Sequence, residues 1–330
     1  MDSVDRKKLL LLSLFLLLSG MLPSCSINQL VVRRAGNVLA GASGGTNVFT
    51  SDNDPELIAQ ALPLVLKLQE ALLEEDPANR NLWLATASGY VSYANAFLQT
   101  PATMLPSSEY LQKEATLARA KNLYIRGRDM ALQGLAISDS RFLQDPRSDE
   151  FAAALRDAGD DDVPLLYWAA AGWLGALSAD PFDMSLNLSR NLGAAIMERA
   201  YALDPEYDDG AIHEFFIAYH AAQPDDPVAG RERARFHYRE AIRLSRGRNS
   251  SPYVSLGEAV KIAEQDLDGF VLLMEAALQV DPEQAPHLRL VNTIRQRQAR
   301  WYLDNLERFF LDAGSWDEDW AEDWDEDWDD

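Results

Sequence analysis

The sequence contains a single cysteine, Cys25, among its 330 residues. One cysteine can form neither a disulfide within the chain nor a cysteine-rich metal cluster, which leaves modification or free-thiol reactivity as its role. There are only four histidines, His213, His220, His237 and His287, and no two of them stand in the HExxH spacing of zinc proteases. No Walker-type phosphate loop occurs either. We therefore expect no catalytic site, no metal site and no cofactor.

Positive charge is also scarce, because 52 acidic residues outnumber 30 basic ones. The formal net charge is −22, and the segment WDEDWAEDWDEDWDD at residues 316–330 supplies ten of the negative charges. A chain with this balance repels nucleic acid, and it carries no nucleic-acid-binding motif. We exclude nucleic acid as a partner.

The first residues have the pattern of an export signal. Three basic residues at 6–8 precede an apolar run at 9–18 that is interrupted only by Ser13. This run is shorter than the ~20 apolar residues that span a bilayer, and small residues follow it as at a cleavage site. The tetrad LPSC at 22–25 resembles a bacterial lipobox. The alternative is an unmodified cysteine near an ordinary signal cleavage site.

We therefore expect residues 1–24 to be a lipoprotein signal peptide and Cys25 to carry the lipid. Several acyl chains hold a protein on a membrane almost permanently. Residues 25–53 are rich in Gly, Ser, Thr and Asn, which is typical of a flexible tether. The predicted location is the periplasm, with the anchor in the inner or the outer bacterial membrane.

The body, residues 54–312, has helical periodicity throughout. In residues 55–75 apolar side chains recur at steps of three and four, Asp54 stands at the N-cap position, and Pro55 occupies the first turn. We find no alternating apolar run flanked by hairpin turns. The sequence therefore predicts an all-α fold.

Three amphipathic stretches end in Asp-Pro, at EEDP, ALDP and QVDP. Small or apolar residues stand 12, 8 and 5 positions before both Pro205 and Pro282, which are the offsets of the second helix of a tetratricopeptide repeat. We predict about four degenerate hairpins, over residues 81–135, 163–205, 210–246 and 251–282. A leading helix at 55–75 and a closing helix at 286–311 flank them, and insertions at 99–109 and 179–187 interrupt them.

Two strings, YDDGA at 207–211 and RQRQARW at 295–301, are specific enough to suggest a family. Together with the surrounding segments, from about residue 82 to 310, they resemble the T-component family (TatT) of lipoproteins associated with TRAP transporters. The resemblance implies a periplasmic lipoprotein that pairs with a solute-binding P component and assists uptake of an apolar or carboxylate-bearing ligand. It also implies a homotrimer with a cleft or pore in each subunit.

A second function class stays open. Most tetratricopeptide arrays bind a peptide or a helix in their concave groove. The alternative is therefore an adaptor or assembly lipoprotein that binds a protein segment and has no role in transport.

Aromatic residues recur at helical spacing in the first two hairpins, and we predict that some of them line a groove, because rings supply large contact areas at low entropic cost. The candidates are Trp83, Tyr90, Tyr93, Trp168 and Trp173. The alternative is packing between hairpins, since the repeat places rings at such positions for that purpose.

Four arginines, Arg231, Arg235, Arg239 and Arg243, follow each other at steps of four. On one helix face this arrangement is repulsive, so an anion should compensate it. We take Arg239 and Arg243 as candidates for binding a ligand or partner. The alternative is a solvated face with salt bridges to glutamates of the same helix.

Residues 313–330 carry a tryptophan at every fourth position from 316 to 328, with carboxylates between them. Aspartate is a poor helix former and the carboxylates repel each other, so the free tail should be disordered. Such a segment can fold onto a basic, partly apolar groove. It could dock on a partner, dock on the basic stretch at 231–248, or only aid solubility.

Overall fold

In a computed structural model, the structure describes residues 48–223 and 225–313, where every regular element is a helix and no strand occurs. The predicted all-α class is therefore confirmed. The leading helix α3 (Pro55–Glu75) has the predicted bounds. Its N-terminus is capped by Asp54, whose Oδ1 accepts a hydrogen bond of 3.0 Å from the Leu57 N–H.

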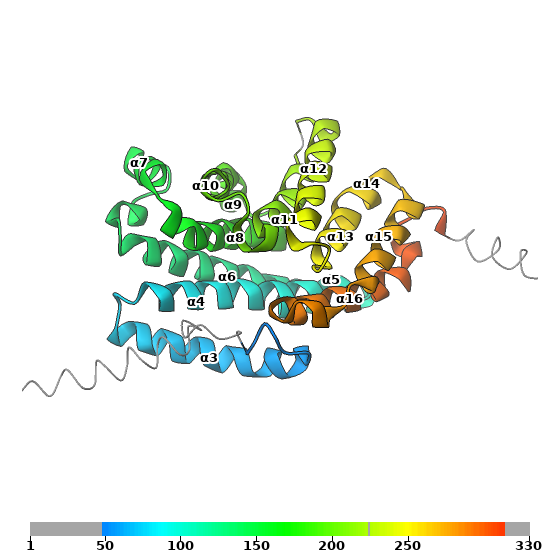
Figure 1. Ribbon diagram of the computed structural model, residues 1–330, viewed down its shortest axis with the longest axis horizontal. Helices are drawn as coiled ribbons and strands as arrows, with labels where there is room; N and C mark the ends of the chain where they lie inside the picture. Colours follow the sequence, from blue (N-terminus) through cyan, green and yellow to red (C-terminus); the bar gives the residue numbers. More distant parts are fainter. Residues whose placement is uncertain (1–47, 224, 314–330) are drawn as a thin grey trace, which may run out of the picture.

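The predicted array of helical hairpins is present (Figure 1). The paired helices are α4 (Arg80–Ala94) with α6 (Tyr110–Ala136), α8 (Val163–Ala179) with α10 (Arg190–Leu203), α11 (Tyr207–Ala221) with α12 (Pro227–Ser245), and α13 (Ser251–Leu256) with α15 (Leu267–Gln279). Helix α6 also packs along α8, so the first two hairpins form continuous layers.

The predicted insertions are more helical than expected. The first was placed at 99–109, but α4 continues through a π-helical segment, Asn95–Gln99, directly into α5 (Thr100–Met104). The chain turns only at residues 105–106, where the backbone is extended. The second insertion, at 179–187, contains most of the short helix α9 (Met184–Leu188), which Asp183 caps.

The closing helix is shorter than the predicted 286–311. Helix α16 covers Arg289–Leu303, and the flanking residues form short 3₁₀ turns at Pro286–Leu288 and Leu306–Arg308. The Asn305 side chain donates a hydrogen bond of 2.8 Å to the Trp301 carbonyl. This bond satisfies a carbonyl at the helix end, and the chain turns there.

Helix α7 (Asp149–Asp157) lies in a region where the sequence analysis assigned no element. Ser148 caps it and Asp149 and Glu150 occupy its first turn, which is a helix-start signal. The helix buries Phe151 against Phe142, with ring centroids 5.6 Å apart in edge-to-face geometry. This pair extends the main core.

Glycines permit the close approach of the central helices. A Cβ on Gly172 of α8 would stand 2.8 Å from the Tyr124 carbonyl oxygen and 2.9 Å from the Arg128 backbone nitrogen of α6. A Cβ on Gly127 would stand 2.6 Å from Val91 of α4. These contacts lock α4, α6 and α8 into one layered core.

The two ends of the described array contact each other. The Leu290 N–H of α16 donates to the Thr50 carbonyl at 3.0 Å, and Arg289 donates to the Ser51 carbonyl at 2.8 Å. Further along α16, Arg297 forms an ion pair with Glu56 of α3. The packed body therefore extends to residue 50, slightly before the expected boundary at 54, and the array closes on itself.

Among residues 48–223 and 225–313, no helix combines the length and the apolar character needed to cross a bilayer.

Candidate functional site

The string at 295–301 places polar side chains on the inner side of α16. Arg295 Nη1 donates to Gln298 Oε1 at 2.8 Å, and Gln298 Nε2 donates to Glu258 Oε1 at 2.7 Å. The Tyr302 hydroxyl donates to the same Glu258 oxygen at 2.5 Å. These bonds link α16 to the π-helical segment Gly257–Lys261. We call the connected residues the inner polar cluster; its members are Glu214, Asn249, Glu258, Arg295, Gln298 and Tyr302.

Glu214 of α11 joins this cluster through Arg295, with Oε1 and Nη2 3.9 Å apart, and accepts a bond of 3.4 Å from Asn249 Nδ2. The side chains of Glu214 and Arg295 are 24% and 15% exposed to solvent, whereas Gln298 and Tyr302 are buried. Burial raises the pKa of Glu214, and the nearby Arg295 charge offsets part of this rise. Glu214, Arg295, Asn249 and Glu258 are thus the partly exposed members of the cluster.

Both π-helical segments of the described chain supply a side chain that accepts a hydrogen bond from a buried tyrosine. In the first segment, Gln99 accepts a hydrogen bond of 2.5 Å from the buried hydroxyl of Tyr124 on α6. Burial raises the pKa of Tyr124, and the Asn95 side chain and then the positive charge of Arg295 oppose that rise. The second segment supplies Glu258. π-Helical turns interrupt α-helices frequently at functional sites.

A left-handed turn lies at the start of α11, in the string at 207–211. Asp208, Asp209 and Gly210 have φ values of 48°, 55° and 95°. Left-handed backbone at two successive non-glycine residues is strained, and such strain concentrates at functional sites. Asp209 Oδ2 and His287 Nε2 lie 2.9 Å apart, which ties the turn to the segment before α16.

Tyr167 of α8 stands between this turn and the cluster. Burial, followed by the negative charges of Glu214 and Asp208, raises its pKa well above the ordinary value. The ring of Tyr167 contacts Trp168 and Tyr207 at centroid distances of 5.0 and 5.3 Å. Trp168, one of the aromatic residues predicted to line a groove, is partly buried and packs against the core of the first two hairpins.

This arrangement suits the binding of a small polar group. A guanidinium such as Arg295 offers parallel donors that match a carboxylate in bidentate geometry. Hydroxyls and amides around it can fix the orientation of a ligand. Among the described residues, no three His, Cys, Asp or Glu side chains are arranged to hold a metal ion.

Three of the other predicted aromatic residues lie in the core. The Tyr90 hydroxyl donates to Glu70 Oε1 at 2.6 Å, and Tyr93 packs on Phe97 at 5.5 Å between ring centroids. The Trp173 indole N–H donates to Ser189 Oγ at 3.0 Å. All three candidate rings are buried and have partners, so packing between helices accounts for them.

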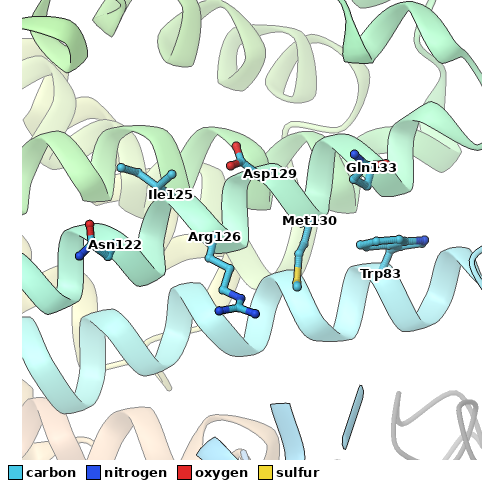
Figure 2. A pocket seen from close by; sticks show the side chains of 7 residues that line it. All are labelled: Trp83, Asn122, Ile125, Arg126, Asp129, Met130 and Gln133. Atoms are coloured by element: carbon cyan, nitrogen blue, oxygen red, sulfur yellow. The ribbon is translucent and has the colours of Figure 1, made fainter. Parts of the chain in front are cut away.

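Trp83 of α4 lines a shallow surface hollow of about 440 Å³ that is wide open to solvent. The other lining residues all come from α6 (Figure 2): Asn122, Ile125, Arg126, Asp129, Met130 and Gln133. Arg126 is already paired with Glu70 at 2.5 Å, and the Trp83 indole N–H donates to the Pro77 carbonyl. The hollow is thus a weaker candidate than the inner polar cluster.

All four predicted arginines lie on α12, where Arg231 and Arg235 pair with Glu264. Arg243 pairs with Glu240 at 2.9 Å and approaches Glu206 at 3.6 Å. Arg239 is exposed and forms no ion pair with the described residues. The predicted lipidation site, Cys25, and the acidic tail from residue 314 lie outside the described residues.

The sequence analysis did not single out Glu214, Glu258 or Arg295. Arg295 lies in one of the two strings that suggested the family, and Glu214 follows the other by a few residues. These two strings were therefore the sequence feature that could have indicated where the site lies. Glu258 follows Gly257 in the second π-helical segment, and nothing in the sequence around it indicates an inward carboxylate.

Comparison with known proteins agrees with the family suggested by the two strings. Residues 51–310 match the family described as TRAP transporter T-component. A protein of Treponema pallidum (strain Nichols), described as an uncharacterized protein, is 32% identical over 302 residues, covering 87% of this chain and 94% of that protein.

Proposed function

Because the chain belongs to the TRAP transporter T-component family, we propose that it is a membrane-anchored periplasmic accessory protein of a TRAP-type transport system. In this role it binds a periplasmic solute-binding protein, the P component, and a small apolar or carboxylate-bearing ligand. The observation that carries the proposal is the family match across residues 51–310, nearly the whole described body. We also propose a homotrimer, which analytical ultracentrifugation of the purified protein tests.

The N-terminal pattern supports the proposed location. A basic segment, a short apolar run and the tetrad ending in Cys25 together direct export and lipid attachment. A lipid-anchored protein stays near a membrane transporter while the solute-binding partner diffuses past it.

The inner polar cluster supports a small ligand rather than a long peptide. Its partly exposed groups, Glu214, Asn249, Glu258 and Arg295, are few and partly buried. The contacts between α16 and the segment before α3 close the array at the ends where an extended peptide would otherwise enter. A carboxylate on the ligand would displace Glu214 from Arg295, at little cost because their present separation of 3.9 Å is long for an ion pair.

The ligand is tested by native mass spectrometry of the full chain after incubation with a lipid extract and with a mixture of short and long aliphatic carboxylates. Arg295→Gln should lower the bound fraction at least tenfold. Arg300→Gln, an exposed arginine on the same helix, is the matched control and should leave the bound fraction unchanged. Equal retention of the ligands by both variants would exclude the inner polar cluster as their site.

A further inference from the structure

Among the arginines of α12, three have a carboxylate partner and two have none within the described part of the chain. Arg231 and Arg235 both pair with Glu264, at 3.0 and 2.6 Å. Arg233 and Arg239 are exposed and form no ion pair within residues 48–223 and 225–313. In a protein with a net charge of −22, such arginines attract an anionic segment.

An exposed aromatic ring stands between the two unpaired arginines. Phe236 is three residues from each of them, so all three side chains share one face of the helix. The ring of Phe236 retains 45% exposure and rests on the rings of His213 and His237, at centroid distances of 6.2 and 5.1 Å. The surface, which we call the α12 face, therefore combines a fixed apolar ring with flanking positive charges.

The described chain ends beside the other flank of α12, the one that carries Arg231 and Arg235, and the segment that follows must cross the helix to reach Arg233 and Phe236. The Leu311 N–H donates to Gln265 Oε1 at 3.1 Å, and Gln265 Nε2 donates to the Phe309 carbonyl at 2.9 Å. The neighbouring Glu264 is the residue that pairs with Arg231 and Arg235 of α12. The last described residues are thus held beside the N-terminal half of α12.

The segment that continues from there is long enough to cover the helix. Residues 314–330 can extend over ~56 Å at 3.3 Å per residue, whereas α12 is ~28 Å long at 1.5 Å per residue. Because the segment is tethered, its effective concentration at the surface is in the millimolar range. Individually weak contacts are then sufficient for docking.

The chemistry of the segment complements the α12 face. Its tryptophans, at 316, 320, 324 and 328, alternate with ten carboxylates. A tryptophan can pack on Phe236 or stack under a guanidinium while the adjacent carboxylates pair with Arg233 and Arg239. Elsewhere in this protein arginines already stack on tryptophan, as Arg308 does on Trp301 at 4.9 Å.

We propose that residues 314–330 dock on the α12 face of their own chain, with their carboxylates on Arg233 and Arg239 and a tryptophan on Phe236.

Pulsed dipolar spectroscopy on the full chain tests this proposal. In a Cys25→Ser background, spin labels are attached to Val228→Cys, an exposed position on α12, and Ala321→Cys in the acidic segment. We expect one narrow, short distance distribution at low salt. The distribution should become broad and longer at high salt, because the contacts are charge-dependent.

The double variant Arg233→Gln/Arg239→Gln should lose most of the narrow component. The control Arg147→Gln/Arg156→Gln removes two exposed arginines beside and within α7, which lies at the left end of the view in Figure 1, apart from α12, and should keep the narrow component. Neutralising the segment itself, with Asp325→Asn, Glu326→Gln and Asp327→Asn, should act like the α12 variant. A broad distribution in the unmodified chain at low salt, or a narrow one that survives both neutralisations, would overturn the proposal.

Discussion

The Nδ1 atoms of His213 and His237 lie 2.9 Å apart, between α11 and α12. At this distance one ring must donate the hydrogen and the other accept it, so both rings cannot be protonated while the contact is kept. His220 stacks on His237 with centroids 5.2 Å apart. Burial, and then the neighbouring histidines, lowers the pKa of His237 to about 3.

This geometry predicts that acid destabilises the α11–α12 hairpin. The folded-state pKa of His237 is below its unfolded value, so the unfolded chain binds more protons between about pH 6.5 and 3. The stabilisation is complete above pH 6.5 and is lost as the pH falls, by up to ~1.4 kcal/mol per pH unit. Urea titrations between pH 7 and 5 should show a shallower decline of the unfolding free energy for His237→Phe than for the unmodified chain. Identical slopes would contradict the assignment.

The close approach of α6 and α8 predicts a large effect of a single methyl group. Gly172→Ala would place a Cβ within 3 Å of backbone atoms of α6, which cannot move independently of the helix. Overpacking of this kind costs ~1–3 kcal/mol. Gly159→Ala is the matched control, because nothing lies within 4 Å of its added Cβ. Thermal unfolding should show a lower Tm for Gly172→Ala alone, and equal Tm values would show that α8 shifts freely.

The proposed lipid anchor at Cys25 predicts that a Cys25→Ser variant distributes differently between detergent and water. Cys25 is the only thiol, so Cys25→Ser leaves no acceptor for a diacylglycerol group. Detergent phase separation of cell extracts should move the protein from the detergent phase to the aqueous phase, or leave it with its signal segment uncleaved. If a variant with a removed signal still enters the detergent phase, another feature holds the protein on the membrane.

Local patterns predicted much of the fold. The bounds of α3 followed from Asp54, Pro55 and a regular apolar period, and Asp-Pro pairs marked the ends of α10 and α15 because proline cannot continue a helix. Helix α7 was missed because it is short, although its cap at Ser148 was readable. The π-helical segments have no sequence signature, so the insertion at 99–109 was placed too early.

The candidate site was less predictable because its residues come from separate helices. Glu214, Glu258 and Arg295 each resemble a solvated charge on an amphipathic helix, and only closure of the array brings them together. The regular spacing of the aromatic residues does not distinguish rings that pack between helices from rings that line a groove. Tyr90 and Trp173 are buried in the core, and Trp168 packs against it while partly buried.

The central claim is that this T component binds a solute-binding protein of a TRAP system. The most direct measurement is biolayer interferometry with the full chain immobilised on the sensor and titrated with the TRAP-type solute-binding protein of the same cell. An unrelated periplasmic solute-binding protein of similar charge serves as the control. We predict saturable binding to the TRAP-type protein alone, and absent binding, or equal binding to both proteins, would contradict the account.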